Sequence, residues 1–297
     1  MLWPLGGTAA MRIDFVKYHG LGNDFAVIDA RDLAIDLDGE PGRRLCDRFT
    51  GLGADGVLLW RGSLADPEME VVNADGSIAE MCGNGLRCFV KHLAETQDRG
   101  VGQLVVRTGA GPRRCTVERD AQGDVTHVTV EMGRPSLDPR RVPTSRAEPT
   151  VHQAFLVAGR TVHLTAIHTG NPHGVVFDTL TAEERRELGP LLGRHELFPV
   201  QANIEFVERL PDGPDGAPRL GVEVFERGCG WTRACGTGAT AAAAAALHLG
   251  VVPSGAPVEV RLPGGWLTIQ LDGDGVATMR GPAVRVYQGA FDLEDFQ

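Results

Sequence analysis

The sequence predicts an α/β protein made of two pseudo-symmetric halves of mixed sheet, and three observations support this prediction. The chain has 297 residues, enough for about two domains at roughly 100–200 residues each. Short runs rich in β-branched residues alternate with short helical patterns along its length. Two short sequence elements also recur in the same order in each half.

The recurring elements are a Gly-Asn turn and a Cys-Gly-x-Gly motif. Residues 19–24 (HGLGND) are echoed by residues 168–173 (HTGNPH), and residues 80–85 (EMCGNG) by residues 233–238 (RACGTG). The offset is 148 residues for the turn and 153 residues for the cysteine. Because independent elements keep their order and approximate spacing, we interpret the chain as two equivalent halves with a cleft between them.

The hydrophobic pattern predicts the individual elements in order. In the first half it predicts strands over 12–16, 25–29, 57–60, 70–73, 104–107, 114–118 and 125–132, and helices over 42–50 and about 86–93, where apolar residues recur at i, i+3, i+4 and i+7. In the second half it predicts strands over 154–157, 163–167, 174–177, 204–207, 221–225, 258–262, 266–270, 276–280 and 284–287, and helices over 182–188 and 236–249.

A proline-rich segment separates the two sets of elements. Residues 134–150 carry four prolines and several charges, a composition typical of a connection between domains. We therefore expect one half over residues 11–133 and the other over 134–281, with residues 1–10 as an irregular extension.

Composition excludes several classes of protein. The formal net charge of −10 argues against broad binding to nucleic acid. No apolar run approaches the ~20 residues that a membrane-spanning helix needs, and the first ten residues lack the features of a signal peptide. The six cysteines are spread over a long chain, which favours free thiols in a reducing cytoplasm over a disulfide framework.

The two Cys-Gly-x-Gly motifs are the strongest indication of chemistry. Each places a cysteine, Cys82 or Cys235, where a helix is expected to begin. Unpaired N–H groups at a helix start stabilise anions, so the pKa of a thiol there can fall to about 3.5–7.5. If both helices face one cleft, one sulfur could remove a proton from one face of a substrate carbon while the other delivers a proton to the opposite face.

Other candidates for chemistry are weaker. We interpret Cys46, Cys88 and Cys115 as small core residues, while Cys229 stays ambiguous. Zinc is disfavoured because the closest cysteine pairs are separated by five residues, against two to four in typical sites. The glycine-rich segments lack the tight strand–turn–helix arrangement of dinucleotide sites. Among the histidines of the repeated turns, His173 is the best candidate for the cleft.

Taken together, the motifs resemble those of the diaminopimelate epimerase family. The matching segments are residues 17–25 (KYHGLGNDF), 73–77 (NADGS), 80–88 (EMCGNGLRC), 169–173 (TGNPH), 226–228 (ERG) and 234–238 (ACGTG). The resemblance implies a pyridoxal-phosphate-independent isomerase that uses no cofactor or metal. Its substrate would be diaminopimelate, interconverted between the LL and meso forms on the way to lysine and peptidoglycan.

The resemblance also implies a fold and an assembly. Each half would be an α/β domain whose sheet wraps around a central helix. The C-terminal strand, about 282–297, would return to the first half. The protein would be a cytoplasmic homodimer with no nucleic-acid or membrane partner.

Residue roles follow from the resemblance at the matching positions. Cys82 and Cys235 would form the thiolate/thiol pair, assisted by His173 and Glu226. The substrate-binding residues would be Asn23, Asn73, Gly83, Asn84, Asn171, Asn203, Glu226, Arg227, Gly236 and Thr237. Such a set of amides, backbone N–H groups, one acid and one arginine suits a substrate with two carboxylates and two ammonium groups.

The sequence departs from the family pattern at a few positions. Trp231 stands where glutamate is common, and Cys229 replaces a residue that is usually small and apolar. Gly56 replaces a glutamine found in some members. We expect these departures to change the packing of the loop before Cys235 and to remove one polar contact.

Three alternatives remain open at this point. A proline racemase-like enzyme would share the two-cysteine logic, but its cyclic substrate needs no distal polar subsite such as Asn171, Asn203 and Arg227. An amino-acid-binding protein without catalysis would have no need of both cysteines. The phenazine-type isomerase branch would lack the cysteine pair altogether.

Overall fold

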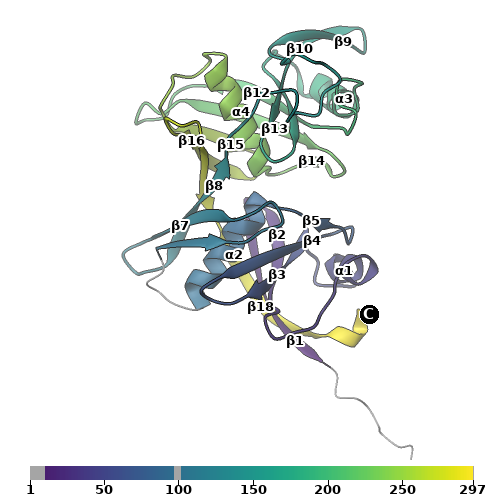
Figure 1. Ribbon diagram of the computed structural model, residues 1–297, viewed down its shortest axis with the longest axis vertical. Coiled ribbons are helices and arrows are strands. Elements are labelled where there is room, and N and C mark those ends of the chain that lie inside the picture. The colour runs from purple at the N-terminus through teal and green to yellow at the C-terminus, as the bar shows by residue number, and fades with distance from the viewer. Residues whose placement is uncertain (1–10, 97–101, 297) are drawn as a thin grey trace, which may run out of the picture.

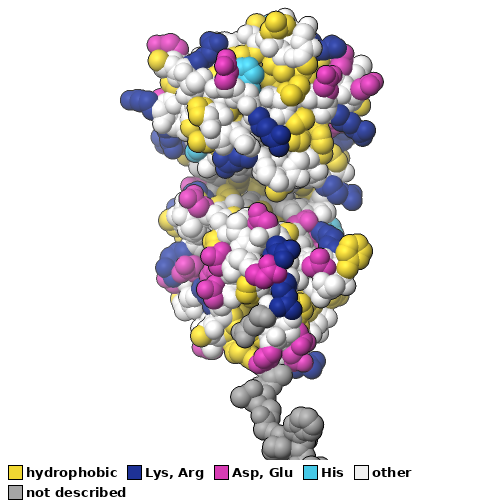
Figure 2. All heavy atoms as spheres, turned by 90° about the vertical axis from the view of Figure 1, so that its right-hand side faces the viewer, with side chains coloured by type: hydrophobic (Ala, Val, Ile, Leu, Met, Phe, Trp, Pro, Cys, Tyr) yellow, Lys and Arg dark blue, Asp and Glu magenta, His cyan; other side chains and the backbone are white. Residues whose placement is uncertain are grey.

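The computed structural model of the protein describes residues 11–96 and 102–296, so the predicted extension over 1–10 lies outside the described residues. Two lobes are stacked along the long axis (Figure 1), and the surface narrows between them (Figure 2). The N-terminal lobe holds α1 and α2, and the C-terminal lobe holds α3 and α4. In the described part of the chain, no helix is both long and apolar enough to cross a membrane.

The N-terminal lobe is built on a six-stranded sheet in the order β18-β1-β2-β3-β4-β5. Its elements are β1 (Arg12–Gly20), β2 (Asn23–Asp29), α1 (Glu40–Cys46), β3 (Gly56–Gly62), β4 (Pro67–Asn73), β5 (Ile78–Ala79), α2 (Gly83–Thr96) and β18 (Val284–Asp292). A short 3₁₀ helix, η1 (Leu293–Asp295), follows β18.

The second sheet runs through both lobes in the order β6-β7-β8-β17-β16-β15-β13-β12-β11-β10-β9, with β14 paired to β13. Its strands are β6 (Gln103–Val106), β7 (Arg113–Arg119), β8 (Val125–Gly133), β9 (Gln153–Val157), β10 (Arg160–His168), β11 (Pro172–Val176), β12 (Asn203–Leu210), β13 (Arg219–Glu226), β14 (Gly230–Thr232), β15 (Val258–Leu262), β16 (Gly265–Leu271) and β17 (Ala277–Pro282). The C-terminal lobe adds α3 (Ala182–Gly193) and α4 (Gly236–His248).

Each lobe has a central helix, as the predicted fold class requires. Helix α2 contacts β1–β4 on one side and β7 and β8 on the other. Helix α4 contacts β10–β13 and β15–β17. Residues 241–246 are six consecutive alanines, all of them buried. Alanine has high helix propensity, and its small side chain lets the surrounding strands approach closely. The prediction of a mixed-sheet α/β protein is confirmed.

The chain does not cross between the lobes in the proline-rich segment over 134–150. It crosses within β8, which pairs with β7 of the N-terminal lobe and with β17, and it returns from β17 into β18. Residues 134–150 instead pack on the C-terminal lobe, where Val142 is buried and Ser136 forms a bridge with His168. The proline-rich segment is thus an irregular surface segment of the C-terminal lobe. The paired strand β8 connects the two lobes, so no separate linker is needed.

Strand β18 pairs antiparallel with β1, from Arg12 opposite Asp292 to His19 opposite Val284. Some predicted boundaries were wrong. Helix α1 ends at Cys46 rather than near residue 50, because Asp47 accepts the N–H groups of Phe49 and Thr50 in a turn. Helix α3 continues to Gly193 beyond the predicted residue 188, and two strands of two and three residues, β5 and β14, were missed.

The repeated turns are alike in structure. The N–H of Gly22 donates to His19 Nδ1 (3.3 Å), and the N–H of Gly170 donates to His168 Nδ1 (3.3 Å). In both cases the histidine stabilises the turn that leads into a strand. The sequence repeat therefore corresponds to a structural repeat.

Candidate active site

Cys82 lies immediately before α2 and caps its first turn. The backbone N–H of Gly85 donates to Cys82 Sγ (3.4 Å), and the thiol donates to Asn23 Oδ1 (3.9 Å). An added Cβ at Gly85 would lie 3.5 Å from the sulfur and 3.1 Å from Leu58 Cδ2, so the glycine lets Leu58 pack closely against this turn. The sulfur therefore sits at the positive end of the helix, as its motif predicts.

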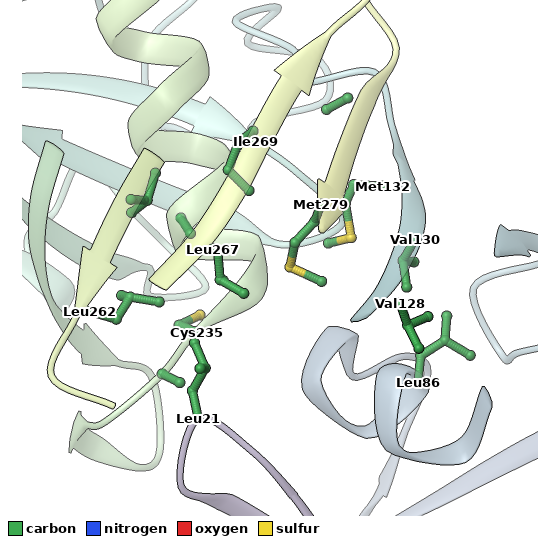
Figure 3. Packing of buried hydrophobic residues seen from close by; sticks show 14 of the residues in the cluster. Leu21, Leu86, Val128, Val130, Met132, Cys235, Leu262, Leu267, Ile269 and Met279 are labelled. Atoms are coloured by element: carbon green, nitrogen blue, oxygen red, sulfur yellow. The ribbon is translucent and has the colours of Figure 1, made fainter. Parts of the chain in front are cut away.

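Cys235 has the equivalent position at α4, where it is the N-cap residue. The N–H of Gly238 donates to its sulfur (3.3 Å), and Thr237 Oγ1 lies 3.4 Å from the same atom. The side chain is 5% exposed and lies beside Leu21, Leu262 and Leu267 (Figure 3).

The two helix starts are joined directly across the lobes. Asn84 Nδ2 donates both to the carbonyl oxygen of Ala234 (3.0 Å), the residue before Cys235, and to Asn23 Oδ1 (3.1 Å). Met279 of β17 lies between them (Figure 3): an added Cβ would lie 3.0 Å from its Cε at Gly83 and 2.8 Å from its Sδ at Gly236. Close packing against Met279 thus explains both glycines, in addition to the predicted approach of a ligand to the backbone.

The pKa values of the thiols differ from the prediction. We expected the helix starts to lower them, but burial raises the pKa of Cys82 and raises that of Cys235 well above its ordinary value. The negative charge of Glu226 raises both values further, and Glu205 adds to the effect at Cys235. The backbone N–H groups oppose the shift but are outweighed by desolvation.

Glu226, at the end of β13, therefore acts on both cysteines. The Thr232 hydroxyl donates to Glu226 Oε1. Burial raises the pKa of Glu226, so its carboxyl takes up a proton more readily than a free glutamate. Together with Arg227 and Cys229, this residue lines a cavity of about 250 Å³.

His173 is fully buried between two oxygen acceptors. Its Nδ1 lies 2.7 Å from Glu205 Oε1 and its Nε2 lies 2.7 Å from Asn171 Oδ1. The same carboxylate faces the first turn of α4, because an added Cβ at Gly238 would lie 2.7 Å from Glu205 Oε1 and 3.3 Å from Cys235 Sγ.

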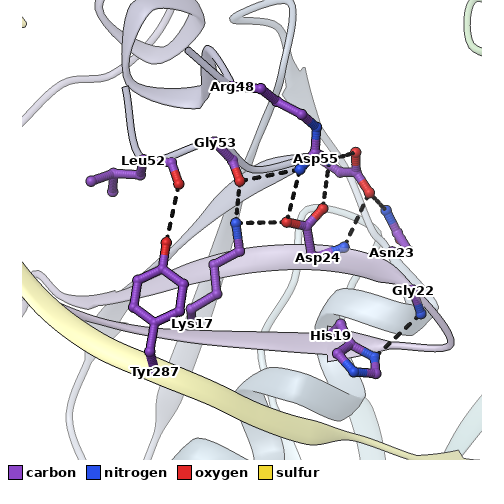
Figure 4. Close-up of polar contacts among 10 residues, drawn as sticks. All are labelled: Lys17, His19, Gly22, Asn23, Asp24, Arg48, Leu52, Gly53, Asp55 and Tyr287. Atoms are coloured by element: carbon purple, nitrogen blue, oxygen red, sulfur yellow. Dashed lines mark hydrogen bonds and ion pairs between the residues drawn. The ribbon is translucent and has the colours of Figure 1, made fainter. Parts of the chain in front are cut away.

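Asn23 is held by a charged network in the N-terminal lobe (Figure 4). Its Nδ2 donates to Asp55 Oδ2 (2.9 Å), which directs its Oδ1 towards Asn84 and Cys82. Arg48 bridges Asp55 (2.6 Å) and Asp24 (2.7 Å). The network fixes the orientation of one amide beside the sulfur.

The remaining predicted residues are placed as follows. Asn203 Oδ1 accepts the N–H of Arg227 (2.8 Å), whose exposed guanidinium donates to Val200 O (2.9 Å). The carbonyl of Thr237 accepts from Thr169 Oγ1 (3.1 Å). Asn73 Nδ2 donates to Ser77 Oγ (3.0 Å) in its own hairpin, and among the described residues its side chain makes no hydrogen bond with either thiol.

Departures from the family pattern change packing around the site. Trp231 stacks on Phe206 (ring centroids 5.9 Å apart) and meets Phe225 edge-on (5.6 Å). Cys229 is exposed, and the pKa of its thiol is raised by partial burial and by the charges of Glu226, Asp75 and Asp55. All six cysteines are free, and no group of three or more metal-ligating side chains occurs in residues 11–96 and 102–296.

Sequence reasoning missed the groups that support the predicted ones. Glu205 and Arg87 are fully buried charged residues, and Asp55 holds Asn23. A charged residue within an otherwise apolar strand, as in residues 203–207 (NIEFV), was the available signal for Glu205.

The comparisons with known proteins agree with this geometry. A family model described as "Diaminopimelate epimerase" matches residues 15–137 and 165–286. The diaminopimelate epimerase of Carboxydothermus hydrogenoformans is 41% identical over 286 residues, covering 95% of this chain and 100% of the relative. That of Desulforudis audaxviator is 43% identical over 282 residues, covering 93% and 98%.

Solved structures share the fold at low sequence identity. A hydroxyproline epimerase from Agrobacterium vitis superposes with a TM-score of 0.67 at 17% identity, covering 94% of this chain and 91% of the other. A PhzF-family phenazine biosynthesis protein of Bacillus anthracis gives 0.68 at 16%, covering 95% and 99%. With the family model matching most of its length and relatives at about 40% identity, this chain belongs to the diaminopimelate epimerase family of isomerases.

Proposed function

We propose that this chain interconverts LL- and meso-diaminopimelate by a two-base mechanism in which Cys82 and Cys235 exchange the roles of base and acid. The observation that carries the proposal is the pair of cysteines, each capping a central helix and linked through Asn84. The membership of this chain in the diaminopimelate epimerase family supports the choice of substrate.

In the proposed step, the thiolate of one cysteine takes the proton from the substrate α-carbon, and the C–H electron pair remains on that carbon. The thiol of the other cysteine then gives its proton to the opposite face, which inverts the stereocentre and leaves this sulfur as the thiolate. No electrons are lost or gained overall. The N–H groups of Gly85 and Gly238 stabilise whichever sulfur is charged.

The raised pKa values fit an enzyme whose thiolate forms when substrate binds. Burial and Glu226 keep both thiols protonated at neutral pH, and the α-ammonium of the substrate would bring the positive charge that favours a thiolate, so that one thiol releases its proton to water as the substrate binds. Glu226 and His173 would assist: Glu226 through its charge, which acts on the pKa of both thiols, and His173 through its hydrogen bond to Glu205.

We further propose that Asn23, Asn73, Asn84, Asn171, Asn203, Glu226, Arg227 and the backbone at Gly83, Gly236 and Thr237 bind the substrate. The exposed Arg227 beside the 250 Å³ cavity supports recognition of a distal carboxylate.

A cytoplasmic homodimer is part of the same proposal. Strand β18 is the edge of the six-stranded sheet, and its Val284, Val286 and Tyr287 are 44%, 53% and 46% exposed. An edge strand with exposed apolar side chains suits a partner surface. Six free thiols suit a reducing compartment.

The deciding experiment is proton NMR of LL-diaminopimelate with the enzyme in deuterated water, with reductant and without pyridoxal phosphate. We expect deuterium at an α-carbon together with the meso isomer. Cys82→Ser should abolish turnover while retaining substrate binding by calorimetry, and Cys115→Ala, a core change in β7, should retain turnover. Deuterium exchange on proline instead would indicate a proline racemase-like enzyme. No deuterium exchange on either substrate would refute the mechanism.

A further inference from the structure

Arg87 in the first turns of α2 is a fully buried cation with an unusual set of partners. Its guanidinium donates to Asn84 Oδ1 (2.9 Å), Pro282 O (3.3 Å), Gly83 O (3.4 Å) and Met279 Sδ (3.4 Å). Its residue exposure is 0%. Among the ion pairs of residues 11–96 and 102–296, none includes Arg87.

The surrounding backbone is shaped to admit this guanidinium. An added Cβ at Gly20 would lie 3.0 Å from Arg87 Nη2, and one at Gly281 would lie 3.2 Å from its Nε. Two glycines from different strands, β1 and β17, thus leave the space that the side chain fills. Burying a cation without a carboxylate is costly, so stability alone does not explain it.

Arg87 acts on the junction of the two cysteine-bearing helices through Asn84. Because its guanidinium occupies Asn84 Oδ1, the Nδ2 of that amide is left to donate to Ala234 O and Asn23 Oδ1. The same guanidinium holds β17 at Pro282, where the chain leaves the large sheet for β18. One side chain thereby orients the amide that joins the two lobes.

The charges around Cys82 give Arg87 a second effect. Glu226, from the end of β13, raises the pKa of the Cys82 thiol, and Arg87, from α2, lowers it. Asn84 and Gly85 add hydrogen bonds from the backbone. Cys88, the other thiol beside the guanidinium, has its pKa raised to about 12 and stays neutral.

We propose that Arg87 is a positioning residue of the epimerase: it orients Asn84 across the lobe junction and places a buried positive charge at Gly83, the residue that follows Cys82. The proposal rests on the proposed two-thiol function only for its effect on turnover. Its effect on the Cys82 thiol stands by itself.

The experiment measures the alkylation of Cys82 by iodoacetamide as a function of pH, in the full-length protein, with peptide mass spectrometry to separate Cys82 from the other cysteines. Arg87→Met removes the charge at similar volume, and we expect the midpoint of alkylation to rise by about one pH unit. Lys91→Met is the matched control. It removes a largely buried cation one turn further along α2, and the midpoint should not move.

Arg87→Lys separates the two effects. An ammonium keeps the charge but cannot hold Asn84 and Pro282 in a fixed fork, so the midpoint should stay while kcat falls about tenfold. A folded Arg87→Met protein with the wild-type midpoint would overturn the electrostatic part. If Arg87→Met does not fold, a shifted pH midpoint of Cys82 alkylation in Arg87→Lys overturns the electrostatic part. A wild-type kcat in Arg87→Lys overturns the positioning part. The alkylation of Cys82 can be measured without turnover, so a failure of the proposal about Arg87 can be distinguished from a failure of the proposed function.

Discussion

Replacing Glu205 tests whether the buried pair with His173 supports the site. Both side chains are 0% exposed and their polar atoms lie 2.7 Å apart. In Glu205→Gln the amide oxygen can still accept from His173 Nδ1. The charge is lost, and an amide NH2 replaces the buried Oε2, which has no hydrogen-bond partner among the described residues, so we expect about 1.5 kcal/mol of destabilisation. Glu205→Ala leaves the imidazole without this partner, and the loss should reach about 3–5 kcal/mol.

The same change should act on Cys235, because the Glu205 charge raises the pKa of its thiol. In Glu205→Gln the pH midpoint of Cys235 alkylation should therefore fall. Urea unfolding measures the stability, and Glu208→Gln on the same strand, an exposed residue paired with Arg261, is the control, with a loss below about 1 kcal/mol. If Glu205→Gln matches the wild type in both urea midpoint and alkylation profile, the reasoning about this pair is wrong.

Three other changes test separate parts of the structure. Gly264→Ala would drive a Cβ into the Leu21 carbonyl oxygen where the lobes meet, so about 3 kcal/mol of stability should be lost in urea unfolding. Asp55→Asn weakens the acceptor that orients Asn23, so KM should rise about tenfold with a smaller change in kcat. Unfolding free energy should fall above pH 9: burial raises the pKa of Cys88 to about 12 in the folded protein against 9.0 when unfolded, so the unfolded chain loses this proton first. Cys88 contributes a loss of about 1.4 kcal/mol per pH unit up to pH 12, beside similar contributions from Cys46 and Cys115.

Each of these has a result that would contradict it. Gly264→Ala should be compared with Gly273→Ala, where an added Cβ meets no atom within 4 Å; equal stabilities would rule out the clash. An Asp55→Asn enzyme with unchanged KM would show that Asn23 does not need this orientation. Cys88→Ala should flatten the alkaline decline, and an unaltered slope would assign the decline to other groups.

The sequence was sufficient to predict the elements and the cysteines, for local reasons. The Cys-Gly-x-Gly motifs carry both the helix start and a thiol, so the positions of Cys82 and Cys235 at the starts of α2 and α4 could be predicted together. The repeated Gly-Asn turns gave the duplication because a turn is specified by a few adjacent residues.

Contacts between residues far apart in the chain could not be predicted from one sequence. Asn84 meets Ala234, 150 residues further along the chain, and no local pattern encodes that contact. The pKa direction at the thiols was mispredicted for the same reason, since burial and Glu226 reach Cys82 only through the tertiary fold. The crossing within β8 was missed because proline content indicates irregular backbone, not where a chain passes between lobes.

The pairing of β18 with β1 sets the order in which the protein can be completed on the ribosome. When β1–β5 have emerged, the strand that will cover the outer edge of β1 is still about 200 residues from being made, which takes on the order of 10–40 s. Throughout that time β1 presents open backbone groups, and such an edge attracts foreign strands. The N-terminal lobe begins first and is completed last, so a truncation that removes β18 would leave the edge of β1 unpaired in the lobe that was made first.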